Sequence, residues 1–328
     1  MFGAARTTTS GRRPFQPGRQ MKRWQSLVPA VVLIGALSGC ENAHRGRTAN
    51  PPVERVVQPA EAPGSSASYS LLDTYDDANV IDWFPQDHPP MPRVVQHGAA
   101  GTGALARGCA ACHLPNGKGR PENAALAGLP VAYFIRQIED FRAGRRHSSD
   151  PRKRNTPTMI ALARAMTDAE AREAAEFYAA LPAAPWLRVV ETDDAPAARL
   201  GGNLYVAAGD GRTEPLAGRV LEVPQDATQS EDLSNPRSGF VAYVSPASVA
   251  RGRALAASCG ACHGAVLRGT DDIPPIAGRS PSYLARQLYD LRTCARNGSK
   301  AALMRPVLAK LSAADITDLA AYLARAGN

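Results

Sequence analysis

The chain has 328 residues, of which 44% are hydrophobic, 21% charged and 6% aromatic, and its formal net charge is +8. Six basic residues precede Cys40 with no acidic residue among them, so a chain that begins at Cys40 has a net charge of only +2. The composition therefore gives no support for binding nucleic acid. The six basic residues are Arg6, Arg12, Arg13, Arg19, Lys22 and Arg23.

Residues 1–39 have the pattern of a secretory signal peptide. Two basic residues precede an apolar run, 27–37, that ends in small residues, and a start at Met21 would give a signal of ordinary length. The alternative is a retained single helix, for which the apolar run is short. The string Leu-Ser-Gly-Cys that ends at Cys40 resembles a bacterial lipobox. We therefore expect an exported protein with Cys40 lipidated and anchored to a membrane on the periplasmic side.

Residues 40–94 follow as a predicted flexible leash. Proline, serine and small residues are frequent in this part of the chain, which is typical of a linker.

Two Cys-x-x-Cys-His strings, the attachment signature of c-type haem, come next. Two intervening residues let one helical turn present both thiols to the vinyl groups on one porphyrin edge, and the adjacent histidine can bind the iron. A zinc site would need four convergent ligands, and a redox dithiol would need a βαβ frame. The expected haem-attaching cysteines are Cys109, Cys112, Cys259 and Cys262, and the expected proximal iron ligands are His113 and His263.

The two strings belong to an internal repeat. They lie 150 residues apart, and the same offset relates Leu126-Ala127-Gly128 to Ile276-Ala277-Gly278 and Arg136-Gln137 to Arg286-Gln287. After a gap of five residues the offset becomes 145. A repeat of this length indicates two copies of one domain, at 95–184 and 246–328.

Each copy predicts three helices. A short helix precedes each string, at 103–108 and 252–258, and a middle helix covers 130–141 and 280–291. The last helix of each copy begins at a capping box, Thr167-x-x-Glu170 or Ser312-x-x-Asp315.

With these motifs, each copy resembles a class I cytochrome c domain, and the pair resembles a tandem, dihaem cytochrome c of the cytochrome c4 type. The resemblance implies an all-α fold with two covalently bound haems. It also implies a methionine as the sixth iron ligand, at Met159 and Met304, and a backbone carbonyl that accepts a hydrogen bond from the proximal histidine. That carbonyl belongs to Pro274 in the second domain and to Ala124 in the first, where proline is replaced.

The repeat separates these methionines from a core methionine. A thioether is a soft ligand that favours ferrous iron. Met159 aligns with Met304, whereas Met166 aligns with Leu311, a residue that cannot bind iron. We therefore expect Met166 to be part of the core.

The segment 185–245 between the domains is too long for a structureless loop. It contains four β-like runs, at 187–191, 204–207, 220–223 and 240–244. It is either an extended segment with short strands that wraps over the domains and covers a haem edge, or a partly ordered tether.

Two features of the domains have alternative interpretations. A basic run between Arg142 and Arg154 either is a solvated loop or steers an acidic redox partner to the first haem. Cys294, which aligns with Gly144, is either an inert small residue or an alternative iron ligand of the kind that dihaem thiosulfate-oxidising enzymes use.

The expected function is electron transfer rather than catalysis, because two methionine ligands leave no open iron site. The expected donors are a dehydrogenase or a quinol oxidoreductase, and the acceptors are an oxidase or another cytochrome. The alternatives are a cytochrome subunit of a periplasmic dehydrogenase, or a dihaem enzyme of the peroxidase or thiosulfate dehydrogenase type. A haem sensor is a weaker alternative.

Overall fold

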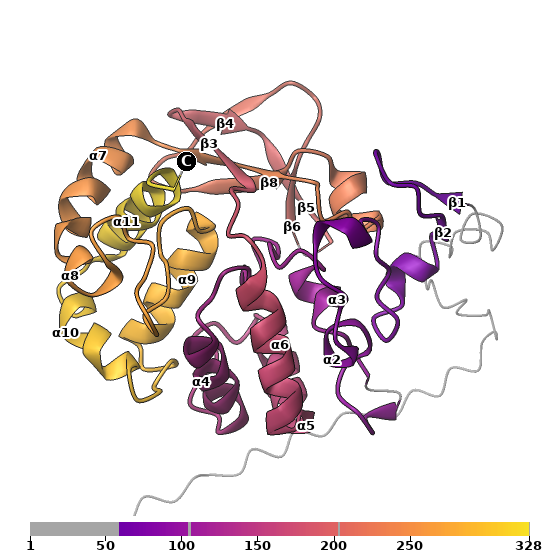
Figure 1. Ribbon diagram of the computed structural model, residues 1–328. Helices are drawn as coiled ribbons and strands as arrows, with labels where there is room; N and C mark the ends of the chain where they lie inside the picture. The colour runs from indigo at the N-terminus through magenta and orange to yellow at the C-terminus, as the bar shows by residue number, and fades with distance from the viewer. Residues whose placement is uncertain (1–58, 104–105, 203, 328) are drawn as a thin grey trace, which may run out of the picture. The chain divides into compact units, whose positions relative to one another are not determined.

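The computed structural model describes residues 59–103, 106–202 and 204–327 (Figure 1). The predicted signal peptide and Cys40 lie outside these residues. No helix among the residues described is long and apolar enough to span a membrane.

The first helical domain is closed by helix α6 (Asp168–Ala180), which begins at the predicted capping box. The Thr167 side chain accepts from the amide of Glu170, and the Glu170 carboxylate accepts from the amide of Thr167 at 2.8 Å. The other helices of this domain are α2 (Arg93–His97), α3 (Ala110–His113), α4 (Val131–Arg142) and α5 (Asn155–Ala165).

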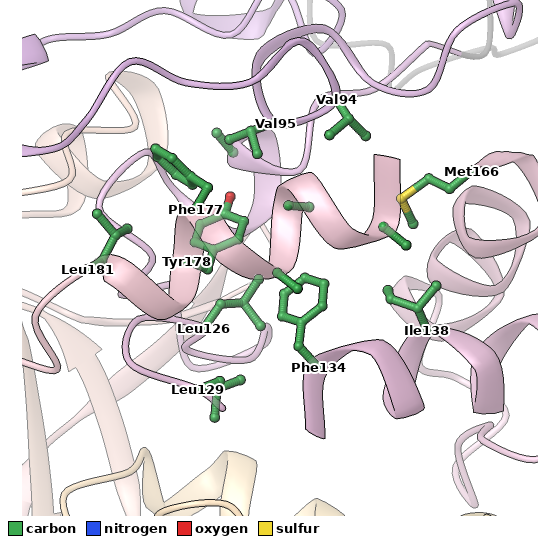
Figure 2. Close-up of a cluster of buried hydrophobic side chains, with 14 of the residues drawn as sticks. Val94, Val95, Leu126, Leu129, Phe134, Ile138, Met166, Phe177, Tyr178 and Leu181 are labelled. Carbon is green, nitrogen blue, oxygen red and sulfur yellow. The ribbon is translucent and has the colours of Figure 1, made fainter. Parts of the chain in front are cut away.

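The core of this domain lies between α2, α4 and α6 (Figure 2). Tyr178 and Phe177 of α6 contact each other edge to face, with ring centroids 5.1 Å apart, and Tyr178 stacks on Phe134 of α4. Met166 belongs to this buried cluster, which confirms its predicted place in the core, and Met159 packs against the cluster from its edge.

The second domain repeats this arrangement. Its helices are α7 (Pro246–Leu255), α8 (Gly260–His263), α9 (Pro281–Arg292), α10 (Arg305–Leu308) and α11 (Ala313–Arg325), with a 3₁₀ turn at Ala301–Met304. The capping box at Ser312 and Asp315 begins α11 as predicted, and α7 packs closely on α11. Gly252 of α7 allows this contact, because a Cβ at this position would clash with the carbonyl oxygen of Asp318.

Among the described residues of 103–108 there is no α-helix, which corrects the helix that the sequence analysis expected there. Gly103 is in 3₁₀ conformation, the amide of Ala106 donates to its carbonyl at 2.9 Å, and residues 106–108 are loop. Gly103 also has a positive φ angle, which an α-helix does not accept. The helix that packs on α6 lies earlier in the chain, as α2 at Arg93–His97.

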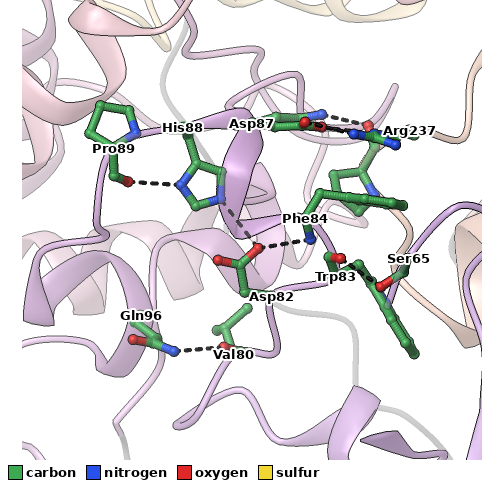
Figure 3. Close-up of polar contacts among 12 residues, drawn as sticks. Ser65, Val80, Asp82, Trp83, Phe84, Asp87, His88, Pro89, Gln96 and Arg237 are labelled. Carbon is green, nitrogen blue, oxygen red and sulfur yellow. Dashed lines mark hydrogen bonds and ion pairs between the residues drawn. The ribbon is translucent and has the colours of Figure 1, made fainter. Parts of the chain in front are cut away.

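Residues 59–94 are ordered, so the predicted leash is wrong for this part of its length. Strands β1 (Pro59–Ala60) and β2 (Tyr69–Ser70) pair, and Trp83 is buried in a small apolar cluster with Phe84 and Leu233. The indole of Trp83 donates to the carbonyl of Leu233 at 2.7 Å. Figure 3 shows the ion pair of Arg237 with Asp87, which joins the same two segments.

The segment between the domains forms β-strands, so the described structure is not all-α as the sequence analysis expected. Strand β9 (Phe240–Val244) pairs in parallel with β3 (Leu187–Glu191) and antiparallel with β8 (Leu221–Pro224). Two further strand pairs complete the segment, namely β4 (Asp194–Pro196) with β7 (Thr213–Pro215) and β5 (Ala198–Gly201) with β6 (Leu204–Ala207). The four predicted runs coincide with β3, β6, β8 and β9 to within one residue at each end.

This segment contacts both domains, as expected of an extended segment that wraps over them. Its sheet packs on the second domain through Ala242 and Ala324, and the Glu222 carboxylate accepts from the Ser280 hydroxyl at 2.8 Å. Toward the first domain, the Ser234 hydroxyl accepts from Arg120 at 2.8 Å.

Candidate functional site

Each Cys-x-x-Cys-His string forms a single helical turn. The amide of His113 donates to the carbonyl of Cys109 at 3.0 Å, and the amide of His263 donates to that of Cys259 at 2.9 Å. Directly after the histidine the chain leaves the helix with a positive φ angle, at Leu114 in the first domain and Gly264 in the second. The helical turn therefore ends directly after the histidine in both domains.

The histidines are held by the carbonyls that the sequence analysis assigned to them. His113 Nδ1 lies 2.8 Å from the carbonyl oxygen of Ala124, and His263 Nδ1 lies 2.8 Å from that of Pro274. A carbonyl can only accept, so Nδ1 carries the proton in both rings and Nε2 is left with its lone pair for a metal. Burial lowers the pKa of His113, which keeps this imidazole neutral.

A cavity of about 590 Å³ in the first domain brings the predicted donors together. Its lining includes His113, Met159 and both cysteines of the string, with apolar side chains such as Phe134 and Ile138. This volume is typical of a site for a cofactor or other small ligand. An imidazole, a thioether and two thiols around an apolar cavity are a donor set that fits haem c.

In the second domain, two of the four predicted donors pack against one core cluster, and Cys262 is exposed. His263 is buried, and Cys259 and Met304 both pack against the core cluster that contains Leu284 and Leu319. A cavity of about 410 Å³ lies beside Cys259, but neither His263 nor Met304 lines it. The fit to haem c in this domain therefore depends on the donor set and on the repeat.

Zinc and dithiol chemistry find no support at these sites. Among the described residues, no group of three or more His, Cys, Asp or Glu side chains could hold a metal ion. Burial raises the pKa of the Cys109 thiol to about 12, which disfavours the thiolate that dithiol exchange requires.

The basic run is only partly solvated, because Arg142, Arg146 and Lys153 are buried or half-buried, which corrects the first interpretation for these residues. Arg146 is buried at 9% exposure and donates to Gln137 at 3.0 Å and to Gln287 of the second domain at 2.9 Å. Arg142 donates to the carbonyl of Met166, and Lys153 donates to that of Glu122. Arg145, Arg152 and Arg154 remain exposed, and 89% of the Arg152 side chain is accessible.

The sequence analysis missed that arginines join the two domains. Arg296, the repeat partner of Arg146, makes the matching bonds to Gln287 at 3.0 Å and to Gln137 at 2.9 Å. Tyr283 and Gln287 of the second domain also line the cavity of the first domain. The repeat relates Arg146 to Arg296 by the offset of 150 residues, but this relation alone does not indicate a contact between the two copies.

Cys294 lies apart from the donors. It is exposed, has a positive φ of 62°, and occupies the turn after α9 that Gly144 occupies after α4. It does not line either of the cavities described above.

A helical domain in which a Cys-x-x-Cys-His turn and a methionine line the same cavity is typical of a c-type cytochrome. The family model for cytochrome c matches residues 98–181 and 249–326. Cytochrome c-554(548) of Halomonas halodenitrificans is 42% identical over 66 residues, which are 20% of this chain and 80% of that protein. The chain belongs to the cytochrome c family, and its two domains make it a dihaem electron-transfer protein with two covalently bound haems.

Two other relatives are informative about the subgroup. The "Thiosulfate dehydrogenase electron acceptor" of Stutzerimonas stutzeri is 25% identical over 239 residues, which cover 72% of this chain and 85% of that protein. "Cytochrome c4" of Pseudomonas aeruginosa is 40% identical over 77 residues, which cover 23% of this chain and 36% of that protein.

Proposed function

We propose that the protein is an electron carrier in which each haem iron has one histidine and one methionine ligand. The pairs are His113 with Met159 and His263 with Met304, and the four string cysteines form the thioether bonds. Bound haem supplies an iron that alternates between the ferrous and ferric states. The carbonyls of Ala124 and Pro274 orient the imidazoles, and the thioethers favour the ferrous state and occupy the sixth position.

One observation carries this proposal: His113 and Met159 line the same apolar cavity. An iron held between these two side chains has no open position at which a substrate could bind. The alternative is a dihaem enzyme, for which an open or cysteine-ligated iron would be needed. The exposed position of Cys294 in the turn after α9 gives that alternative no support.

We further propose that the electron donor is a dehydrogenase that oxidises an inorganic sulfur compound. The relative whose alignment covers 72% of this chain, at 25% identity, is named as the electron acceptor of thiosulfate dehydrogenase. A quinol oxidoreductase remains the second candidate donor, and an oxidase or another cytochrome is the proposed acceptor. The proposed location is the periplasmic side of a membrane, with Cys40 as the lipid-bearing residue, and it is supported by the signal pattern that precedes Cys40.

The experiment mixes the ferric holoprotein with thiosulfate, first alone and then with a catalytic amount of purified thiosulfate dehydrogenase. The absorbance of the ferrous haems measures reduction. We expect both haems to be reduced only when the dehydrogenase is present. Reduction by thiosulfate alone would contradict the carrier and favour an enzyme. No reduction in either mixture, with rapid reduction by a quinol oxidoreductase, would contradict the sulfur-compound donor.

A further inference from the structure

The loops that support the two proximal histidines lie at the contact between the haem domains. In the first domain this loop is 121–125 and includes the Ala124 carbonyl that accepts from His113. In the second domain it is 271–274 and includes the Pro274 carbonyl that accepts from His263. Each loop is also hydrogen-bonded by arginine side chains of the other domain.

Two arginines of the second domain hold the loop of the first. Arg279 Nη1 donates to the carbonyl of Ala125 at 2.8 Å, one residue from the carbonyl that accepts from His113. Arg286 of α9 donates through Nη2 to the carbonyl of Pro121 at the other end of the same loop. The Ala124 carbonyl therefore lies between two backbone oxygens that are fixed from outside its own domain.

One arginine of the first domain holds the loop of the second with both ends of its guanidinium. Arg136 of α4 donates through Nη2 to the carbonyl of Asp272 at 2.7 Å and through Nη1 to its carboxylate at 3.0 Å. Asp272 lies two residues before Pro274. This two-point contact is the geometry for which a planar guanidinium is suited and an ammonium is not.

The exchange is reciprocal because it follows the internal repeat. Arg136 and Arg286 are repeat partners, and each reaches the loop of the domain to which it does not belong. The same symmetry appears in the pairing of Arg146 with Arg296, whose backbones form an antiparallel bridge between the domains. At this contact between the two domains, both loops that support a histidine therefore accept hydrogen bonds from arginines of the other domain.

We infer that Arg136, Arg279 and Arg286 are positioning residues that act across the domain contact, so that each domain sets the hydrogen bond of the other domain's proximal histidine. The hydrogen bond at Nδ1 fixes the orientation and the basicity of a metal-bound imidazole. Loosening the loop weakens that bond in the domain opposite the substituted residue. The inference depends on the proposed ligation by His113 and His263.

The test follows exchange of the Nδ1 protons of His113 and His263 with deuterium, by NMR of the full ferrous holoprotein. Ring-current shifts of the two imidazoles in the wild type first establish that both are haem ligands, and their absence would contradict the proposed function itself. Given those shifts, Arg279→Gln should accelerate exchange at His113 by about fivefold, the equivalent of one hydrogen bond, and leave His263 unchanged. Arg136→Gln should do the reverse.

Arg292→Gln is the matched control, because this arginine also lies on α9 but donates to the carbonyl of Leu311 within its own domain at 3.0 Å. It should leave exchange at His113 unchanged. Arg136→Lys keeps the charge and loses the two-point contact, so it should accelerate exchange at His263 less than Arg136→Gln does. It also provides the test if Arg136→Gln does not fold. Acceleration only within the substituted residue's own domain, equal acceleration at both histidines, or none at either would overturn the inference.

Discussion

At the scale of single residues, the two thioethers decide whether the irons exchange electrons or bind substrates. Met159 lines the first cavity with His113, and Met304 packs on the second core with Cys259. Met166 also lines the first cavity, so proximity alone does not separate it from Met159. The repeat does, because leucine stands at the position equivalent to Met166.

Met159→Ala should lower the reduction potential of the first haem and leave the second nearly unchanged. Loss of the soft thioether removes a ligand that favours ferrous iron, and water takes its place. A redox titration that resolves both haems measures this, with Met304→Ala as the mirror experiment and Met166→Leu as the control without effect. A larger fall with Met166→Leu than with Met159→Ala would show that the ligand has been assigned to the wrong residue.

Glu122 gives the first domain a pH dependence that its repeat position does not share. Its Oε2 atom is buried and has no hydrogen-bond partner among the described residues, and burial raises the pKa of this carboxyl to about 7. Asp272 stands at the equivalent position, and its hydrogen bond with Lys300 lowers the pKa of that carboxyl. The charges of Arg120 and Lys153 lower the pKa of Glu122 and that of Glu231 raises it, but burial has the largest effect.

The free energy of unfolding should fall as the pH rises from about 4.5 through about 7, because in this range the native Glu122 holds a proton that the unfolded chain has released. Glu122→Gln should remove this part of the pH dependence, whereas Glu139→Gln, at an exposed position on α4, should retain it. Urea unfolding of the holoprotein between pH 4 and 8 measures the effect. An unchanged pH profile in Glu122→Gln would refute the assignment.

At the scale of elements, local signals predicted where the last helix of each domain begins, but they failed for α2 and for the N-terminal segment. The capping boxes at Thr167 and Ser312 are made within four residues, so the sequence shows where α6 and α11 begin. The order of residues 59–94 depends instead on Trp83, whose indole bonds a carbonyl 150 positions away. A proline-rich composition cannot reveal a partner at that separation, and it therefore suggested a leash.

Thr167→Ala should destabilise the holoprotein by about 1 kcal/mol, since the capping hydroxyl satisfies an amide at the start of α6. Thr158→Ala is a suitable control, because this residue lies within α5 and its hydroxyl donates to the carbonyl of Arg154, one turn earlier in the helix, at 3.3 Å. Denaturant unfolding of both variants compares the two losses. Equal losses would mean that the capping box does not stabilise α6.

At the scale of the whole molecule, the repeat predicted both haem domains but not their contact. The donors follow from spacing within each copy, and the structure brings His113 and Met159 to one cavity. The contact depends on side chains such as Arg146, which the sequence presents as part of a basic run. Whether such a run is solvated or buried is decided by the packing of two copies, on which local spacing carries no information.

Attachment to a membrane should depend on Cys40. Cys40→Ala should release a soluble, haem-loaded protein or stall its processing, because the proposed acyl chains provide the anchor. Cys294→Ala is the control, since Cys294 is an exposed cysteine of the second domain with no proposed lipid. Fractionation and mass spectrometry of the N-terminus compare them. A Cys40→Ala protein that stays on the membrane without lipid would indicate a retained helix instead.

Carbon monoxide binding by the dithionite-reduced holoprotein tests the central claim most directly, because carbon monoxide binds ferrous haem only where the sixth position is open or weakly held. Two irons ligated by Met159 and Met304 predict no rapid spectral change at either haem. The variants Met159→Ala and Met304→Ala should each add one rapidly reacting haem. Rapid binding at one haem of the unmodified protein would contradict the carrier and assign that haem to catalysis.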